Sequence, residues 1–211
     1  MPIHIRLATE ADAESCHAIY ATAVEQTPAS FEFEPPSVDE MRRRMQRTVE
    51  KLPWLVLEQD GQVVGYAYAS PHHERIGYKW VVNASIYIDA RNRRRGFGRA
   101  LYTVLFELLR HQGYFTAYAG ITLPNPASIA LHERMGFEAV GVYRRVGYKL
   151  GAWHDVGWWE LTLKERALNP PDPLPLPDLI GSTALDHAFA AGQAFLYELL
   201  RSDADRSEII R

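Results

Sequence analysis

The sequence has 211 residues, and its 23 Lys and Arg against 26 Asp and Glu give a formal net charge of −3 at pH 7. That balance argues against the overall basic surface that holds nucleic acid, and no stretch approaches the roughly 20 apolar residues of a membrane span. The single cysteine, Cys16, rules out an intramolecular disulfide, and the N-terminus lacks the apolar segment of a secretory signal. We therefore expect a cytoplasmic protein with neither nucleic acid nor membrane as a partner.

The first 50 residues predict one strand and two helices. Apolar and polar residues alternate over residues 3–7, as they do in a strand. Thr9 followed by Asp12, and Ser37 followed by Glu40, resemble capping boxes, in which paired side chains satisfy free amides at a helix start. A helix is expected after each pair, with a loop rich in Thr, Pro, Phe and Glu between the two helices.

Three strands are predicted next. Residues 54–58 and residues 62–69 flank Asp60-Gly61, a dipeptide typical of a two-residue hairpin turn. Residues 80–88 form a third, mostly apolar strand in this interpretation. The first two strands should therefore pair as a hairpin.

The second half of the chain begins with a basic, glycine-bearing turn at residues 89–98. It leads into a helix with leucines at helical spacing, which Gly113 is placed to end. The remaining elements expected are a strand at 116–121, a helix at 126–135, and strands at 137–143 and 156–163. This order predicts an α/β fold of the α+β type, with a mixed, largely antiparallel central sheet and helices on both faces.

The composition changes after Lys164 and divides the chain into three parts. Residues 1–164 form the predicted domain, and residues 165–181 contain the run NPPDPLPLPD, which indicates a stiff proline-rich linker. Residues 182–211 show an amphipathic helical pattern. Because an isolated helix cannot bury its own apolar face, we expect this extension to dock on the domain or on a second subunit.

The basic turn itself, Arg93-Arg-Arg-Gly96-Phe-Gly98-Arg99, carries the chemistry. Successive amides at a helix start form an anion site that the helix dipole strengthens, and glycine lets the backbone approach a pyrophosphate closely. A tight turn with a solvated basic rim is the alternative. A dinucleotide fingerprint would place its third glycine at Leu101, and the Gly-Lys-Ser/Thr of a P-loop is missing.

Two motifs together resemble the GNAT acetyltransferase superfamily. Arg93-x-x-Gly96-x-Gly98 after a strand resembles its acetyl-CoA motif, and residues 123–137 resemble its second conserved block. Within the superfamily, the chain is most similar to the phosphinothricin N-acetyltransferase family. That likeness covers about residues 3–163 and extends to residues 31–35, 67–71 and 147–157.

The resemblance implies acetyl-CoA as the co-substrate and no metal. The coenzyme would lie in a cleft where the strands at residues 80–88 and 116–121 splay apart, with its pantetheine arm on one strand and its pyrophosphate on the basic turn. The coenzyme-binding residues that the resemblance implies are Ile86, Tyr87, Ile88, Arg93, Arg94, Arg95, Gly96, Phe97, Gly98, Arg99, Asn125 and Ser128. Sheet packing for residues 86–88 and helix capping for Asn125 are the structural alternatives.

The resemblance gives candidates for the residues that transfer protons. His132 stands where many members keep a tyrosine near the coenzyme sulfur, so it is a candidate general acid, with a purely structural role as the alternative. The family's glutamate before the coenzyme-binding strand residues is Asn83 here, and an amide cannot act as a base. Asn83 would orient a water, or a different group or bulk water would take the proton. The candidate bases are Glu34, His72, His73 and His154.

The acceptor pocket is expected to involve Phe31, Tyr78, Lys79, Trp153 and His154. A carboxylate on the acceptor would find a cation in Lys79 or Arg75. Trp153, Trp158 and Trp159 are alternatively core aromatics, and strand alternation assigns at least one of the last two to the core.

These observations predict a homodimeric N-acetyltransferase that moves acetyl from acetyl-CoA to the primary amine of a small amino-acid-like molecule of the phosphinothricin or methionine sulfone type. Two alternatives stay open. One is acetylation of a peptide or protein amine, and the other is a non-catalytic acyl-CoA sensor, which the asparagine at position 83 suggests.

Overall fold

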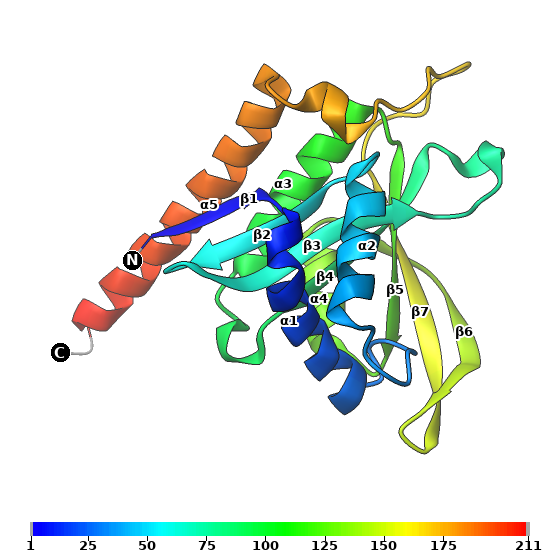
Figure 1. Cartoon of the computed structure of the whole chain (residues 1–211), viewed down its shortest axis with the longest axis horizontal. Helices are drawn as coiled ribbons and strands as arrows, with labels where there is room; N and C mark the ends of the chain where they lie inside the picture. Colours follow the sequence, from blue (N-terminus) through cyan, green and yellow to red (C-terminus); the bar gives the residue numbers. More distant parts are fainter. Residues whose placement is uncertain (1, 210–211) are drawn as a thin grey trace.

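The computed structural model describes residues 2–209, with side chains to residue 201, and contains one seven-stranded sheet with helices on both faces (Figure 1). The strands are β1 (Ile3–Leu7), β2 (Trp54–Gln59), β3 (Gln62–Pro71), β4 (Val81–Ile88), β5 (Thr116–Leu123), β6 (Glu138–Lys149) and β7 (Ala152–Thr162). The α-helices are α1 (Ala13–Gln26), α2 (Val38–Val49), α3 (Phe97–Gln112), α4 (Pro126–Arg134) and α5 (Thr183–Ile209). The strand order is β1-β2-β3-β4-β5-β7-β6, and only the β4–β5 pair is parallel. The predicted fold class and element order are confirmed.

The predicted start signals of the first two helices are present. Thr9 and Asp12 form a capping box around a short 3₁₀ turn, and α1 follows directly. The Ser37 hydroxyl oxygen accepts a hydrogen bond from the Glu40 amide at 3.1 Å and caps α2. Asp12 also accepts two hydrogen bonds from the Arg6 guanidinium, at 2.7 and 2.8 Å. The helix start is therefore tied to β1 as well as capped.

The β2–β3 hairpin turns on Asp60 and Gly61, as predicted. Their φ angles of 52° and 78° are both positive, which the tight turns that match strand twist require. The β6–β7 hairpin is longer than predicted, because β6 continues to Lys149 and β7 starts at Ala152. The sequence missed this extension because register shifts near Gly141 and Gly147 interrupt the alternation.

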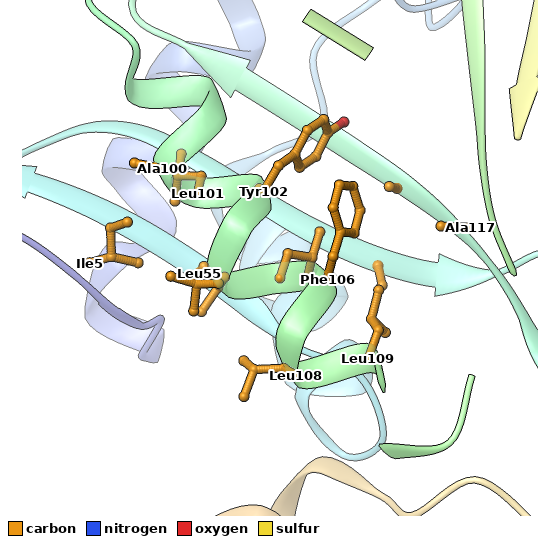
Figure 2. Packing of buried hydrophobic residues seen from close by; sticks show 14 of the residues in the cluster. Ile5, Leu55, Ala100, Leu101, Tyr102, Phe106, Leu108, Leu109 and Ala117 are labelled. Carbon is orange, nitrogen blue, oxygen red and sulfur yellow. The ribbon is translucent and has the colours of Figure 1, made fainter. Parts of the chain in front are cut away.

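Two apolar layers cover the sheet. On one face α1 and α2 pack over β2 and β3, and on the other α3 packs over the same strands (Figure 1). Figure 2 shows the buried side chains of α3, among them Leu101 and Phe106, lying with Leu55 and Ala117 from the strands. Cys16 is fully buried in the layer with α1, and burial raises the pKa of its thiol to about 12. A buried thiol with a raised pKa is a poor nucleophile, so Cys16 has a packing role.

A fork opens in the middle of the sheet. β4 pairs with β5 only from Val81 to Asn83, and the last paired residues are Asn83 and Tyr118. Beyond them β4 continues to Ile88, paired with β3 alone, and β5 continues to Leu123, paired with β7 alone. The splay that the family resemblance implies is present, and it leaves the facing backbone edges of both strands without a strand partner.

The C-terminal helix docks on its own domain. In the linker, the buried residues Leu176 and Leu179 lie in a 3₁₀ turn, and α5 then runs antiparallel to α3 and along β1 (Figure 1). The closest approach is at Gly192, where an added Cβ would lie 2.3 Å from the Val104 side chain. The sequence left open whether this helix docks on its own domain or on a second subunit, and in the structure it docks on its own domain. No helix among the described residues is long and apolar enough to cross a bilayer.

Candidate active site

The basic turn before α3 offers a row of free amides. Arg94 and Gly96 both have positive φ, at 62° and 76°, and Gly96 caps the helix. Among the backbone of residues 2–209 and the side chains up to residue 201, nothing accepts a hydrogen bond from the backbone amides of residues 94–98. Amides that converge at the start of a helix, with its positive dipole end, bind anions. The local geometry is therefore that of the anion site that the sequence predicts.

The arginines of this turn add positive charge. Arg93, Arg94 and Arg99 are exposed, whereas Arg95 donates to Gln59 and Asn92 at 3.0 and 2.9 Å. None of the four forms an ion pair with a carboxylate among the side chains up to residue 201. The concentration of positive charge on the turn favours a phosphate-bearing ligand.

The two glycines of the turn have a packing role that the sequence did not indicate. A Cβ at Gly96 would lie 2.4 Å from Cδ1 of Leu199 on α5. A Cβ at Gly98 would lie 3.0 Å from Leu131 on α4 and 3.4 Å from Ile86 on β4. The glycines thus bring the turn, β4 and both helices into close contact at the fork.

Residues 86–88 contribute side chains to both layers of the core. Ile86 and Ile88 pack with the α3 layer, and Tyr87 packs between Tyr20 and Tyr66 in the α1 layer. Their backbone edge toward β5 has no strand partner. The structural alternative and the predicted backbone role are therefore compatible.

His132 is buried on α4 with both ring nitrogens engaged. It is 3% exposed, and Nδ1 lies 2.8 Å from the Ser128 carbonyl oxygen, so Nδ1 carries the hydrogen. Nε2 then accepts the hydrogen bond of the Tyr102 hydroxyl at 3.0 Å. Burial lowers the pKa of His132 below its ordinary value, so the ring is neutral. This arrangement matches the structural alternative for His132.

Asn125 and Ser128 lie at the start of the same helix. The Asn125 side chain accepts a hydrogen bond from the Ser128 amide at 3.1 Å, which is the capping role that the sequence left open. The side-chain oxygen of Asn125 is therefore already engaged in capping α4.

The opposite face of the fork carries a polar and aromatic cluster. Nδ1 of His72, at the end of β3, lies 2.8 Å from Oδ1 of Asn83 on β4. The His72 ring lies 4.8 Å from the Tyr118 ring, centroid to centroid, and 6.1 Å from Trp158 in an edge-on geometry. The Tyr118 hydroxyl donates to Glu160 at 2.8 Å. Burial, then the Glu160 carboxylate, raises the pKa of Tyr118.

An apolar cavity of about 440 Å³ opens beside this cluster. Its lining comes from the Phe31 loop and the β6–β7 hairpin: Phe31, Phe33, Tyr143, Val146, Gly147, Tyr148, Val156 and Trp158. Phe31 packs so closely on Gly147 that an added Cβ would lie 2.2 Å from its ring. Trp158 belongs both to the cavity and to the surroundings of His72, so cavity and fork adjoin.

The other predicted acceptor residues do not line this cavity, but Trp153 and His154 lie next to residues that do, and the His154 ring is 6.3 Å from the Phe31 ring, centroid to centroid. Trp153 is 62% exposed and stacks edge-on with Tyr148, and His154 donates from Nε2 to the Lys149 carbonyl at 3.0 Å. Lys79 pairs with Asp172 of the linker and lies over the Trp80 ring.

Tyr78 is exposed, with its ring 6.0 Å from His72, and so borders the cluster. Glu34 is exposed on its loop and has no hydrogen-bond or ion-pair partner among the described residues. Of the predicted acceptor and base residues, Phe31 lines the cavity, and His72, Tyr78 and Asn83 lie at the fork.

Sequence reasoning missed Lys149 and Tyr118. Lys149 is 3% exposed and donates to the carbonyl oxygens of Val24 and Ser30 at 2.5 and 2.6 Å, which fixes the loop that carries Phe31. Strand alternation did indicate the division between the two tryptophans, since Trp159 is in the core and Trp158 lines the cavity. No group of three or more potential metal-ligating side chains occurs in the described part of the chain.

Comparison with known proteins gives the family. The family described as Acetyltransferase (GNAT) domain matches residues 5–158. The phosphinothricin N-acetyltransferase of Streptomyces viridochromogenes is 39% identical over 173 residues, 82% of this chain and 93% of that protein. The L-methionine sulfoximine/L-methionine sulfone acetyltransferase of Salmonella typhimurium is 33% identical over 164 residues, 77% of this chain and 96% of that protein.

A solved structure shares the fold as well. The crystal structure of a phosphinothricin acetyltransferase from Sinorhizobium meliloti in complex with acetyl-CoA superposes with a TM-score of 0.78 at 34% identity. It covers 82% of this chain and 96% of that one. Helix α5 lies beyond the residues that the family matches. With the free amides of the basic turn, the fork and these matches, the chain belongs to the GNAT acetyltransferase family.

Proposed function

We propose that this acetyltransferase moves the acetyl group of acetyl-CoA to the primary amine of a small amino-acid-like molecule, of the type represented by phosphinothricin, methionine sulfone and methionine sulfoximine. The names of the related enzymes support this acceptor class. The observation that carries the proposal is the row of free amides at residues 94–98, with its arginines, beside the β4–β5 fork.

The residues present fit the coenzyme. The amides of residues 94–98 would hold the pyrophosphate, with Arg93, Arg94 and Arg99 as counter-charges. The unpaired edge of β4 at residues 86–88 would pair with the amides of the pantetheine arm as an added strand does. Asn125 and Ser128, at the start of α4, would flank that arm from the second side of the fork.

When bound, acetyl-CoA supplies a thioester whose carbonyl carbon a neutral amine attacks. The chain's own contribution is to aim the two reactants at each other through the fork. His132 enters this proposal as the residue that fixes the Tyr102 hydroxyl on the coenzyme side. Glu34 is left out, because no contact directs its exposed carboxylate toward the fork.

The cavity supports a small acceptor over a peptide. Its lining is apolar and its volume of about 440 Å³ suits a compact side chain. The Phe31 loop closes one side of it, held in place by Lys149. An extended peptide would require an open groove at the same place.

The test is the release of free CoA from acetyl-CoA in the presence of an amine panel. Phosphinothricin, methionine sulfone and methionine sulfoximine are the first trials, and a peptide array and propionyl-CoA are the comparisons. Faster turnover of a free amino-acid-like amine than of any peptide supports the proposal. A stronger signal from peptides would favour acetylation of a peptide or protein amine. Coenzyme binding without turnover on any amine would favour a non-catalytic acyl-CoA sensor.

A homodimer and a cytoplasmic location are part of the same proposal. The apolar face of α5 is used on its own domain, so support for a dimer comes instead from the outer edge strand β6, where Val140, Val142 and Val146 are about half exposed. Light scattering of the full chain should give the mass of a dimer. The Val142→Arg variant should give a mass closer to that of the monomer. The control variant Leu168→Arg, on the linker, should keep the dimer mass. A monomer mass for the unchanged chain contradicts the dimer.

A further inference from the structure

The strongest unassigned feature is the contact between His72 and Asn83, whose Nδ1 and Oδ1 atoms lie 2.8 Å apart. We propose that His72 is the general base that accepts the proton of the acceptor amine, and that Asn83 is a positioning residue that fixes its tautomer. This inference rests on the proposed function, because it assigns a step of that reaction.

The hydrogen bonds of Asn83 determine which nitrogen of His72 is basic. The Asn83 amide nitrogen, Nδ2, donates to the Pro71 carbonyl oxygen at 3.4 Å, and a carbonyl oxygen can only accept. The Asn83 oxygen is therefore the atom that faces His72, so Nδ1 of the imidazole carries the hydrogen. In the neutral ring Nε2 then holds a lone pair, and no described residue forms a hydrogen bond with it.

The position of the ring suits a base that meets the incoming amine. Asn83 is the last residue of β4 that pairs with β5, so the pair stands where the fork opens. The ring lies over Tyr118 and edge-on to Trp158, which also lines the apolar cavity. His72 is therefore at the boundary between the proposed acceptor cavity and the proposed path of the thioester.

The other titratable groups near the fork are already engaged. Nδ1 of His73 accepts a hydrogen bond from the Arg75 amide, so the lone pair of its neutral ring is used, whereas the His154 ring donates from Nε2 to the Lys149 carbonyl and lies beside Phe31. Glu160 accepts the hydroxyl hydrogen of Tyr118. The groups that face His72 are Tyr78 from the 3₁₀ turn, Asn83 from β4, Tyr118 from β5, with Glu160 behind it, and Trp158 from β7.

The step balances with these groups. As the amine nitrogen forms its bond to the carbonyl carbon, its proton moves to Nε2 of His72, and the carbon–sulfur bond breaks to release the coenzyme as a thiolate. The resulting imidazolium keeps its Nδ1–H bond to Asn83 and returns the added proton to water.

The decisive variant is His72→Asn, which keeps a donor near the position of Nδ1 and removes the basic nitrogen. A positioned base contributes about 10²- to 10⁴-fold, so kcat should fall at least about a hundredfold while the KM for acetyl-CoA stays within about twofold. His73→Ala is the matched control on the neighbouring residue and should keep the rate of the unchanged enzyme. His72→Gln serves in its place if His72→Asn does not fold.

Two further readouts separate a base from a structural residue. Free imidazole should restore part of the rate of His72→Ala, which it would not do for a residue that only supports the fold. Asn83→Ala should lower kcat by about tenfold, because the ring loses its tautomer partner. A folded His72→Asn enzyme whose kcat falls by less than about a hundredfold overturns the inference.

Failure of this inference is distinct from failure of the proposed function. If the unchanged enzyme releases CoA with an amine and His72→Asn does so equally well, only the base assignment is wrong. If the unchanged enzyme binds acetyl-CoA but acetylates no amine, the proposed function and the base assignment that rests on it are both wrong.

Discussion

The Tyr102 hydroxyl donates a 3.0 Å hydrogen bond to Nε2 of His132, and the bond joins α3 to α4 beneath the fork. Both side chains are buried, and the His132 ring also packs edge-on against Phe137 at 5.0 Å. The two helices that would flank the coenzyme are therefore held together by a polar contact that depends on a neutral imidazole.

This contact predicts a pH dependence of stability. Burial lowers the pKa of His132 in the folded protein, so the unfolded chain binds the proton first as pH falls. The contribution of His132 should be complete above about pH 6.5, the ordinary histidine value, and be lost as pH falls below it. His132→Phe should cost about 1–3 kcal/mol at pH 7.5, because the Tyr102 hydroxyl loses its acceptor, and should unfold with a shallower dependence on pH between 7.5 and 5. Urea melts at both pH values measure this, with exposed His111→Gln as the control.

The arginines of the turn predict a salt-dependent affinity for the coenzyme. Replacing both Arg93 and Arg94 by Ala should weaken acetyl-CoA binding about tenfold or more, at roughly 1 kcal/mol for each charged contact. The loss should shrink as salt screens the charges. Isothermal titration at 50 and 500 mM NaCl tests this, with Arg42→Ala on α2 as the control. An unchanged affinity would exclude Arg93 and Arg94 as contacts of the coenzyme.

The contact between Gly96 and Leu199 predicts coupling between the turn and the C-terminal helix. Gly96→Ala should destabilise the protein by about 2 kcal/mol, because the residue has positive φ and its Cβ would lie 2.4 Å from Leu199. The double change Gly96→Ala/Leu199→Ala should cost less than the sum of the single changes, since the smaller side chain relieves the overlap. Additive costs in a double-mutant cycle would contradict this coupling.

Lys149 predicts an effect on the acceptor side alone. Lys149→Met leaves the carbonyl groups of Val24 and Ser30 without their donor, at a cost of about 1–3 kcal/mol. Because Ser30 belongs to the loop that carries Phe31, the KM for the amine should rise severalfold while the affinity for acetyl-CoA is retained. Steady-state kinetics with each substrate varied separates the two. Lys164→Met, at an exposed position, should change neither.

Much of the fold was predictable because its signals are local. The capping boxes at Thr9 and Ser37 and the Asp60-Gly61 turn depend on residues a few positions apart, and all three are present as predicted. The β6–β7 hairpin was predicted too short, because its bulges and its exposed strand break the alternation on which strand prediction depends.

The part of the candidate site that is formed by the backbone of one segment could be predicted from the sequence. The parts that depend on contacts between side chains far apart in the sequence could not. The turn at residues 93–99 could be located from its glycines and arginines alone. The partners of His72 and Lys79 could not, since Asn83 and Asp172 reach them only through strand pairing and the path of the linker. The positive charge of Lys79 suggested a carboxylate-binding role, but a distant aspartate already pairs with it.

The glycine contacts of α5 limit how far the catalytic domain can be separated from its extension. A fragment ending at Lys164 would uncover the strip of α3 around Ala100 and Val104 against which Gly192 lies, and the pocket that fully buries Leu196 would open to water. Residues 1–164 fused to another protein would thus expose an apolar patch that favours aggregation, unless polar residues replaced that strip.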